Sequence, residues 1–369
     1  MGIKLTPVIA GFIPLLDSAV LVAAKEKGFA EQEGIALQLI RETSWANIRD
    51  RLAVGHFDVA HMLAPMPIAA SLNLTSLAVP MLAPMVLGLG GNAITVAIPI
   101  WRHMAELGAD LDGDPASTGV AFAKVLSARK ERGESRLRFG VVHPFSGHAY
   151  ELRYWLAAAG LDPDIDVEIT VVPPQLMADA LAAGQLDGYC VGEPWNTAAV
   201  QAGTGRIATY KQAIWPDSPE KVLGVTRKWA NAQPDTLSAL MRAISAAADW
   251  CAQSDHLTEL AQLLAGPKYI DCSSDLCVPA LGGEMKLGKN THKSIPDFLT
   301  FSGGLRAAPS PTQGVWFFSQ MVRWGQAVAD PEAERQAAEI FSPEFYEAAL
   351  GLGLVGEPQA IRLFDMPVV

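Results

Sequence analysis

The sequence has few cysteines, few charged residues and no excess of basic ones. Its 369 residues include only 4 cysteines, and 18% are charged. Four irregularly spaced cysteines exclude a disulfide-built scaffold and favour reduced thiols. The 28 Lys and Arg residues against 39 Asp and Glu residues give a net charge of −11. This balance excludes a broad nucleic-acid footprint, which needs clustered positive charge, but it leaves room for a local site that binds a small anion.

Long uninterrupted apolar runs are also missing. The most apolar stretch, residues 78–89, is broken by two prolines and a glycine, and it is shorter than the ~20 residues that a membrane span needs. The first apolar run after Met1 is interrupted by Pro14 and Asp17, which is unlike a secretory signal. We therefore expect a cytoplasmic protein without a membrane segment.

The apolar half of the chain is arranged in an alternating pattern of strands and helices. At ~150 residues per domain, the length suggests about two domains. The pattern predicts strands at 4–10, 35–40 and 59–62, separated by helices at 18–27 and 45–53. Such a βαβαβ order is typical of a mostly parallel sheet in an α/β fold.

The middle of the chain repeats this order. Strands are predicted at 138–142, 167–172 and 188–191, with helices at 149–159 and 175–182 between them. Two segments even align at a constant offset, Leu52–Asp58 with Leu181–Asp187. Two chance βαβ units would give a similar pattern, but the whole rhythm favours two lobes of like architecture.

These patterns divide the chain into four parts. We expect the first part of lobe 1 at 1–108, a connector at 109–137, lobe 2 at 138–216, and a return to lobe 1 with extra C-terminal helices at 217–369. Two α/β lobes place a ligand in the cleft between them, where strand ends and helix N-termini converge.

Common catalytic motifs are absent from the sequence. It has no G-x-S-x-G elbow, no H-E-x-x-H pair and no dinucleotide fingerprint. The segment Gly283–Asn290 departs from a phosphate-binding loop because Asn290 replaces the metal-binding Ser or Thr and no apolar strand precedes it. Cys272 and Cys277 lack the second ligand pair of a zinc site. We therefore expect no enzyme, no cofactor and no metal.

Four polar residues occupy positions that suit a small anion site. Trp45 and His148 lie at predicted helix starts, where free N–H groups and the helix dipole favour negative charge. Lys221 begins a predicted return strand, and Glu193 follows the strand at 188–191. Each also has a structural interpretation: a core tryptophan, a buried histidine, a solvated lysine and a turn-capping glutamate.

Several longer runs carry a family resemblance across nearly the whole chain. They are Gly11–Leu15, Ser44–Asp50, Ala60–Pro67, Gly91–Val96, Arg153–Ala157, Tyr189–Trp195, Pro219–Gly224 and Trp324–Gly325. In these runs the sequence resembles the nitrate/bicarbonate-binding proteins, the NrtA/CmpA family. Because the exported members carry a secretion signal and a lipid-anchor cysteine that this chain lacks, it most resembles their cytoplasmic branch, the NasS-type nitrate/nitrite sensors.

The resemblance implies a fold, a ligand and a set of contacts. The fold is the two-lobe, type II periplasmic-binding-protein-like fold, with the ligand cleft between the lobes. Trp45, His148 and Lys221 correspond to oxyanion-holding residues, and Asn92 is the nearest candidate for a further polar contact. Glu193 is a fifth candidate, either ordering a donor or receiving a cation. Nitrate or nitrite, held by charge-assisted donors in a dry cleft, is the implied ligand.

The resemblance also implies a partner. A NasS-type sensor binds a NasT-type antiterminator, an RNA-binding protein, and releases it when the anion arrives, which regulates nitrate assimilation. The alternative is a solute-binding protein of a nitrate/bicarbonate ABC importer. A third hypothesis is an enzyme of the thiamine-precursor type, for which Cys190 is the only suggestive thiol.

Overall fold

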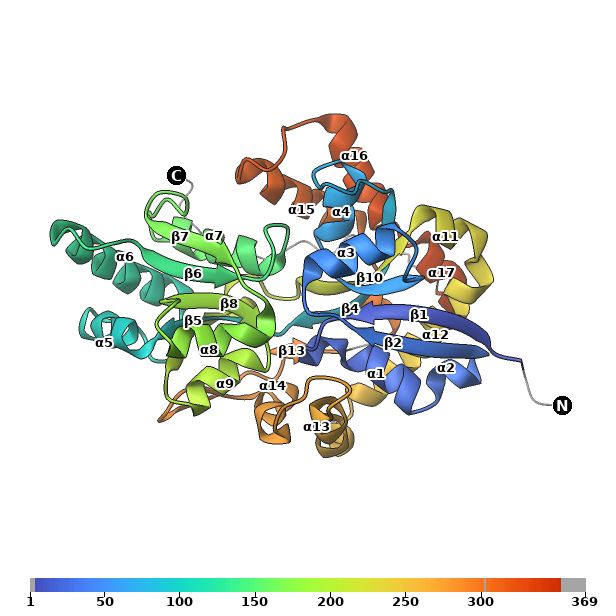
Figure 1. The fold of residues 1–369 in the computed structure, drawn as a ribbon, viewed down its shortest axis with the longest axis horizontal. Helices are drawn as coiled ribbons and strands as arrows, with labels where there is room; N and C mark the ends of the chain where they lie inside the picture. Colours follow the sequence, from blue (N-terminus) through green and yellow to red (C-terminus); the bar gives the residue numbers. More distant parts are fainter. Residues whose placement is uncertain (1–3, 302, 353–369) are drawn as a thin grey trace. The chain divides into compact units, whose positions relative to one another are not determined.

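The computed structural model describes residues 4–301 and 303–352, and these residues form two compact units. Unit 1 takes the described residues up to Leu89, the segment Ser218–Cys272 and the described residues between Thr300 and residue 352. Unit 2 takes Gly90–Asp217 and Ser273–Leu299. Each unit has its own sheet and its own covering helices (Figure 1).

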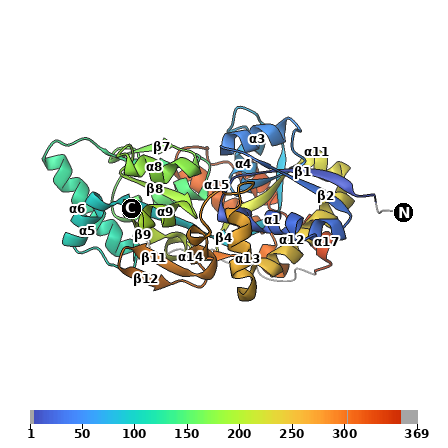
Figure 2. The same cartoon turned by 60° about the horizontal axis from the view of Figure 1, so that its bottom comes forward.

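Unit 1 is built on a six-stranded sheet in the order β13-β4-β10-β3-β1-β2. β1 runs parallel to β2 and β3, whereas β10 runs antiparallel to β3 and β4. β1 and β2 lie side by side in both ribbon views (Figure 1 and Figure 2). The strands are β1 (Thr6–Phe12), β2 (Ile35–Arg41), β3 (Val59–Leu63), β4 (Met81–Gly90), β10 (Pro219–Thr226) and β13 (Leu299–Thr300).

The helices of unit 1 cover this sheet and bury its apolar faces. The N-terminal helices are α1 (Ala19–Glu26), α2 (Phe29–Gln32), α3 (Trp45–Ala53) and α4 (Met66–Ser71). The later helices are α11 (Arg227–Ala232), α12 (Pro234–Cys251), α13 (Leu257–Ala265), α15 (Pro311–Arg323), α16 (Pro331–Ile340) and α17 (Glu344–Leu350). α1 packs against α12 and buries six consecutive residues.

Unit 2 is built on a five-stranded sheet in the order β7-β6-β8-β5-β9. β6 runs parallel to β7 and β8, and β5 runs antiparallel to β8 and β9. The strands are β5 (Asn92–Ala97), β6 (Leu137–Val141), β7 (Val167–Val171), β8 (Gly188–Gly192) and β9 (Gly205–Tyr210), with a separate hairpin of β11 (Glu284–Gly288) and β12 (Thr291–Ser294).

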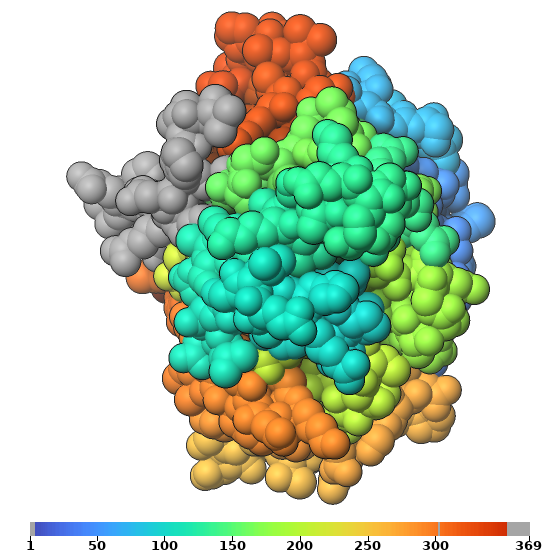
Figure 3. Space-filling view, turned by 90° about the vertical axis from the view of Figure 1, so that its left-hand side faces the viewer, coloured from blue at the N-terminus to red at the C-terminus, as the bar shows by residue number. Residues whose placement is uncertain are grey.

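The helices of unit 2 pack on this sheet and on each other. They are α5 (Ile98–Glu106), α6 (Pro115–Glu131), α7 (Gly147–Ala158), α8 (Met177–Ala182), α9 (Trp195–Gln201), α10 (Lys211–Ile214) and α14 (Val278–Gly282). α5 and α6 form much of the surface that faces the viewer in Figure 3, where they are teal.

Local chemistry explains why the predicted elements form where they do. Ser44 accepts the backbone N–H of Asn47, so α3 begins at Trp45 as predicted. α1 ends just before Gly28, whose φ of 77° lies in the left-handed region that favours glycine. The return strand predicted after residue 220 is β10, and it joins the sheet of unit 1.

The expected domain boundaries differ from the observed ones. The chain enters unit 2 at Gly90, not after residue 108, and the expected connector at 109–137 belongs to unit 2. The reason is packing: α6 lies against α7, and the buried indole of Trp155 donates to the carbonyl of Pro115 at 3.1 Å. Residues 273–299 also belong to unit 2, whereas the end of the expected return, 353–369, lies outside the described residues.

The most apolar stretch of the sequence, residues 78–89, is mostly a strand. It forms most of β4, every residue of which is buried in unit 1. Among the helices of the described residues, none combines the length and apolarity that crossing a bilayer requires.

Candidate functional site

Trp45 lies at the start of α3 in unit 1. Its side chain is buried, and its indole Nε1 finds no hydrogen-bond acceptor among the described residues. A buried N–H without an acceptor is unusual in a folded protein because its lost hydration is not replaced. The first turn of a helix also leaves backbone N–H groups without helical partners. This position therefore suits a ligand that accepts hydrogen bonds.

Lys221 is close to Trp45, because β10 lies beside β3 and α3 packs on both strands. Its Nζ lies 5.4 Å from the centroid of the Trp45 ring. The ammonium is fully buried and pairs with Asp17 at 2.7 Å and with Glu220 at 2.9 Å. Burial alone would lower the pKa of Lys221, but Asp17 and then Glu220 outweigh burial and raise it, so the side chain stays charged.

Besides Glu220, which adjoins the predicted Lys221, two buried residues of this cluster were missed at the sequence level. Asp17 is the one charged residue in the apolar run from Leu15 to Ala24, and His61 lies within the apolar strand β3. A polar residue inside a wholly buried segment is the signal that could have found both. The ring of His61 lies 5.4 Å from the ring of Trp45, and its Nε2 lies 3.1 Å from Oδ1 of Asp17, outside hydrogen-bond alignment.

The charges of Asp17 and His61 follow from their surroundings. Burial alone would raise the pKa of Asp17, but Lys221 and then His61 lower it below its usual value. Burial lowers the pKa of His61, and the two contributions of Asp17 do not restore it. At neutral pH the side chains of Lys221 and Asp17 are therefore charged, whereas the imidazole of His61 is neutral.

His148 is the second residue of α7 in unit 2. It is fully buried, and the preceding Ser146 caps the helix by accepting the N–H of Ala149 at 3.0 Å. Ser146 in turn donates its hydroxyl to the carbonyl of His143 at 2.6 Å. The sequence-based placement of His148 at a capped helix start is confirmed, and its ligand role stays a prediction.

Asn92 begins β5 and is tied to α7. Its Nδ2 lies 3.2 Å from both carboxylate oxygens of Glu151. Lys211 also donates to Glu151, at 2.8 Å, and the Cys190 thiol lies 3.7 Å from it. The amide donor of Asn92 is thus directed at a carboxylate, and its buried Oδ1 has no donor within the described part of unit 2. Turning the amide round would place two acceptors together, so this orientation is the stable one.

Glu193 lies in the turn between β8 and α9, before a cis peptide bond to Pro194. Its Oε2 accepts the backbone N–H of Thr197 at 3.0 Å, and the buried Oε1 meets no donor in the described chain. Burial raises the pKa of Glu193 to about 7, against hydrogen bonds from Thr197 and Asn196 that lower it. This carboxyl is therefore partly protonated near neutral pH.

The five predicted site residues thus fall into two groups. Trp45 and Lys221 meet in unit 1. In unit 2, Asn92 pairs with Gly192 in the β5–β8 ladder, which brings it next to Glu193. His148 lies on the same helix as Glu151, the hydrogen-bond partner of Asn92. A ligand cleft between the lobes stays a sequence-based prediction.

The same ladders show that the two groups are related. Lys221 pairs with Leu63 in unit 1, and Asn92 pairs with Gly192 in unit 2. Leu63 and Gly192 are 129 residues apart, the offset of the predicted repeat. The lysine and the asparagine therefore occupy corresponding positions on the antiparallel strand of each sheet, and each contacts a carboxylate, Asp17 or Glu151.

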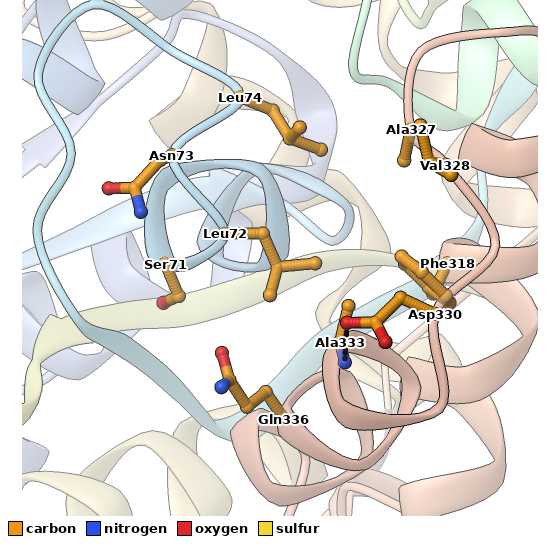
Figure 4. A pocket seen from close by; sticks show the side chains of 10 residues that line it. All are labelled: Ser71, Leu72, Asn73, Leu74, Phe318, Ala327, Val328, Asp330, Ala333 and Gln336. Carbon is orange, nitrogen blue, oxygen red and sulfur yellow. Dashed lines mark hydrogen bonds between the residues drawn. The ribbon is translucent and has the colours of Figure 1, made fainter.

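A separate pocket of about 310 Å³ lies in unit 1, between the end of α4 and the segment carrying α15 and α16 (Figure 4). Asp330 accepts the N–H of Ala333 there, which caps α16, and Ser71 accepts the N–H of Met81. Its lining contains no basic side chain. This pocket therefore lacks the positively charged donors that would favour an anion.

The remaining sequence motifs add no second site. Gly283–Asn290 spans the β11 strand and the turn of its hairpin instead of a strand-to-helix loop, so it is not a phosphate-binding loop. Within residues 4–301 and 303–352, no group of three or more His, Cys, Asp or Glu side chains is arranged to hold a metal ion.

Comparison with known proteins places this site in a family. A model of the NMT1-like family matches residues 2–265, which is more than half of the chain. The chain belongs to the NMT1-like family. The nitrate/nitrite binding protein NrtA of Synechococcus elongatus is 30% identical over 353 residues, which are 93% of this chain and 77% of NrtA. This match places the chain in the nitrate/bicarbonate-binding protein family.

Other relatives carry the same domain in longer proteins. The bicarbonate transport ATP-binding protein CmpC of Synechocystis sp. is 36% identical over 366 residues, which are 96% of this chain and 52% of CmpC. The chain thus spans about half the length of these longer relatives, which match 96% of it. The names of CmpC and NrtA describe transport and binding proteins, and neither is called a sensor.

A solved structure confirms the fold. The periplasmic nitrate-binding protein NrtA from Synechocystis has a TM-score of 0.85 and 26% identity to this chain, covering 96% of it and 90% of NrtA. The predicted two-lobe α/β fold of the periplasmic-binding-protein type and the nitrate/bicarbonate-binding family are both confirmed.

Proposed function

We propose that this chain binds nitrate or nitrite, and that the anion accepts the indole N–H of Trp45 beside the ammonium of Lys221. The observation that carries the proposal is the buried, unpartnered Nε1 of Trp45, with the Lys221 Nζ 5.4 Å from the same ring. Both groups only donate hydrogen bonds, and nitrate and nitrite only accept them. Family membership supports this ligand class, because NrtA is a nitrate/nitrite binding protein.

The planar shape and single charge of nitrate fit the donors of unit 1. Two of the three ammonium protons of Lys221 are directed at Asp17 and Glu220, which leaves one for the ligand. A charge-assisted hydrogen bond from a buried ammonium contributes about 2 kcal/mol, and the neutral indole N–H about 1 kcal/mol. Bicarbonate is the competing ligand, because CmpC is a bicarbonate transport protein.

Calorimetric titration of the purified chain with nitrate, nitrite, bicarbonate and chloride tests this proposal. We expect saturable heat with nitrate or nitrite and none with chloride. Lys221→Met combined with Asp17→Asn keeps the net charge of the cluster, and we expect it to weaken binding by about 30-fold, the equivalent of ~2 kcal/mol. Lys228→Met removes an exposed lysine of α11 as the matched control. Unchanged nitrate affinity in the folded double variant would contradict the proposed site.

Two uses of the bound anion are to be distinguished. Delivery to an ABC importer is the first, because CmpC is named as a transport protein and the matched Synechocystis structure as periplasmic. Control of a NasT-type antiterminator, with the chain in the cytoplasm, is the second. The net charge of −11 favours a protein partner over direct RNA contact in that case.

Two experiments distinguish these uses: cell fractionation of the native protein, and purification of its complexes with and without nitrate. Recovery outside the cytoplasm, or in complex with importer subunits, supports delivery. Recovery in the cytoplasm with an RNA-binding protein that nitrate releases supports the sensor. Such release would require the anion to favour the partner-free state, by the reciprocity of coupled binding.

A further inference from the structure

His61 has no role in the site inferred above, yet it lies at its centre. It projects from β3 toward the ring of Trp45 and the carboxylate of Asp17. Both ring nitrogens are buried, and neither makes a hydrogen bond within the described residues. A neutral imidazole with both nitrogens unsatisfied is costly in a dry interior. The position of this unsatisfied imidazole beside the proposed anion site therefore needs a physical explanation.

The charge balance around His61 gives that reason. Asp17, from the turn before α1, and Glu220 and Lys221, from β10, are the charged groups whose fields act on the imidazole. α3 contributes the neutral ring of Trp45, and β1 and α4 contain no charged residue. The carboxylate of Asp17 is the charge nearest to the imidazole, 3.1 Å from its Nε2. A monoanion arriving at Lys221 and Trp45 adds a further negative charge beside it in a region of low dielectric.

The corresponding position of unit 2 holds a different residue. Cys190, 129 residues after His61, lies beside the carboxylate of Glu151, which pairs with the ammonium of Lys211. The imidazole is thus a feature of unit 1 that the repeat in unit 2 does not share. An imidazole is the side chain that can gain a positive charge near neutral pH.

We propose that His61 takes up a proton when the anion binds beside Lys221 and Trp45, so that it becomes a charge-compensating residue of the site. Protonated His61 pairs with Asp17, whose Oδ1 is 3.1 Å from its Nε2. Asp17 then shares its charge between His61 and Lys221, and the ammonium of Lys221 becomes more available to the anion. The inference rests on the proposed function, since it concerns the same anion.

The linkage has a definite sign. If the protein takes up a proton when the anion binds, a higher proton concentration favours anion binding. The affinity for the anion therefore weakens as the pH rises. The dissociation constant then increases by up to about tenfold per pH unit, over the range in which His61 is neutral without the anion and protonated with it. Nitrate does not take up a proton in this range, so the proton is bound by the protein.

Calorimetry with nitrate in buffers of different ionisation enthalpy measures this proton directly. We expect the observed heat to depend on the buffer, with a slope approaching about one proton taken up per anion near pH 6.5. Heat that is the same in every buffer would overturn the inference and leave the proposed function intact. No heat with nitrate or nitrite in any buffer would instead refute the proposed function.

Variants identify the residue that takes up the proton. His61→Gln keeps a polar side chain of similar size and cannot titrate, so we expect it to bind nitrate without proton uptake. His292→Gln, on the exposed face of β12, is the matched control and should keep the uptake. Uptake that survives in His61→Gln, or that disappears only in Glu193→Gln, would assign the proton to another group and overturn the inference.

Discussion

Two buried tryptophans of this chain differ in the partner of the indole N–H. Trp155 donates to Pro115, whereas Trp45 donates to nothing in the described residues. We expect Trp45→Phe to weaken nitrate binding by about fivefold, the loss of one neutral hydrogen bond of ~1 kcal/mol, and to lower the unfolding free energy only through the packing that the smaller ring loses.

Trp155→Phe is the matched control for that substitution. It should lower the unfolding free energy by about 1 kcal/mol, because the Pro115 carbonyl loses its donor, and it should leave nitrate affinity unchanged. Calorimetry and urea unfolding on both variants give the comparison. An equal loss of affinity in the two would show that Trp45 acts by packing alone.

Glu193 makes the stability of the chain depend on pH. Burial raises its pKa from 4.5 to about 7, so between these values the folded state holds a proton that the unfolded state has lost. The stabilising contribution of Glu193 to the unfolding free energy is therefore present at low pH. It is lost as the pH rises toward 7, and the loss is up to about 3 kcal/mol. Glu193→Gln should remove it, since the amide stays neutral and can still accept from Thr197.

Urea unfolding of the native chain and of Glu193→Gln, at about pH 5 and about pH 8, measures this contribution. Comparing the two proteins cancels the other titrating groups, including His61, whose lowered pKa acts in the opposite direction. The same change in unfolding free energy with pH in both proteins would mean that Glu193 ionises as an exposed carboxyl does.

At the scale of elements, the two units repeat one βαβ design at an offset of 129 residues. Asp58 accepts the N–H of Ile9 at 2.8 Å in unit 1, and Asp187 accepts the N–H of Arg138 at 2.8 Å in unit 2. Asp58 precedes β3 and pairs with β1, and Asp187 precedes β8 and pairs with β6. The repeat predicted from Leu52–Asp58 and Leu181–Asp187 is therefore confirmed as a shared structural role.

The packing of the first strands repeats as well. A Cβ added at Gly11 of β1 would overlap the ring of Phe57, and one added at Gly140 of β6 would lie 2.8 Å from Leu186. Both pairs of positions differ by 129. Only glycine on β1 or β6 lets the side chain that precedes β3 or β8 pack this closely against that strand.

The same substitution at each of the two carboxylates tests whether they contribute equally to the unfolding free energy as well as occupying equivalent positions. We expect Asp58→Asn and Asp187→Asn each to lower the unfolding free energy by about 1 kcal/mol, because a charge-assisted bond becomes a neutral one. Nitrate affinity should stay unchanged in both. Urea unfolding measures the two losses, and a loss confined to one variant would contradict an equivalent role.

The helices and strands that carry the site can be predicted from local sequence, but the contacts between their side chains cannot. Ser44 and Gly28 place α3 and the end of α1, because a cap and a left-handed residue act within a few positions. That Lys221 meets Asp17, and Asn92 meets Glu151, depends on contacts between residues distant in the chain. The sequence therefore predicted the helix starts and strand ends but missed Asp17 and His61.

At the scale of the whole molecule, the chain combines an acidic surface with a buried ammonium. The net charge of −11 is unfavourable for attracting anions over a distance. Binding must then come from short-range donors, where a low dielectric makes each hydrogen bond strong. The domain boundaries could not be predicted from composition, because α6 carries the glycine, proline and charge of a linker and is nevertheless packed into unit 2.

The central claim is that the indole N–H of Trp45 donates to the bound oxyanion. Nitrogen-15 NMR of the tryptophan side chains tests it most directly, with the Trp45 signal assigned by its loss in Trp45→Phe. On titration with nitrate or nitrite, we expect the Trp45 indole resonance to shift downfield in step with the calorimetric binding curve, while that of Trp155 stays in place. Saturable binding heat with an unchanged Trp45 resonance would contradict the account.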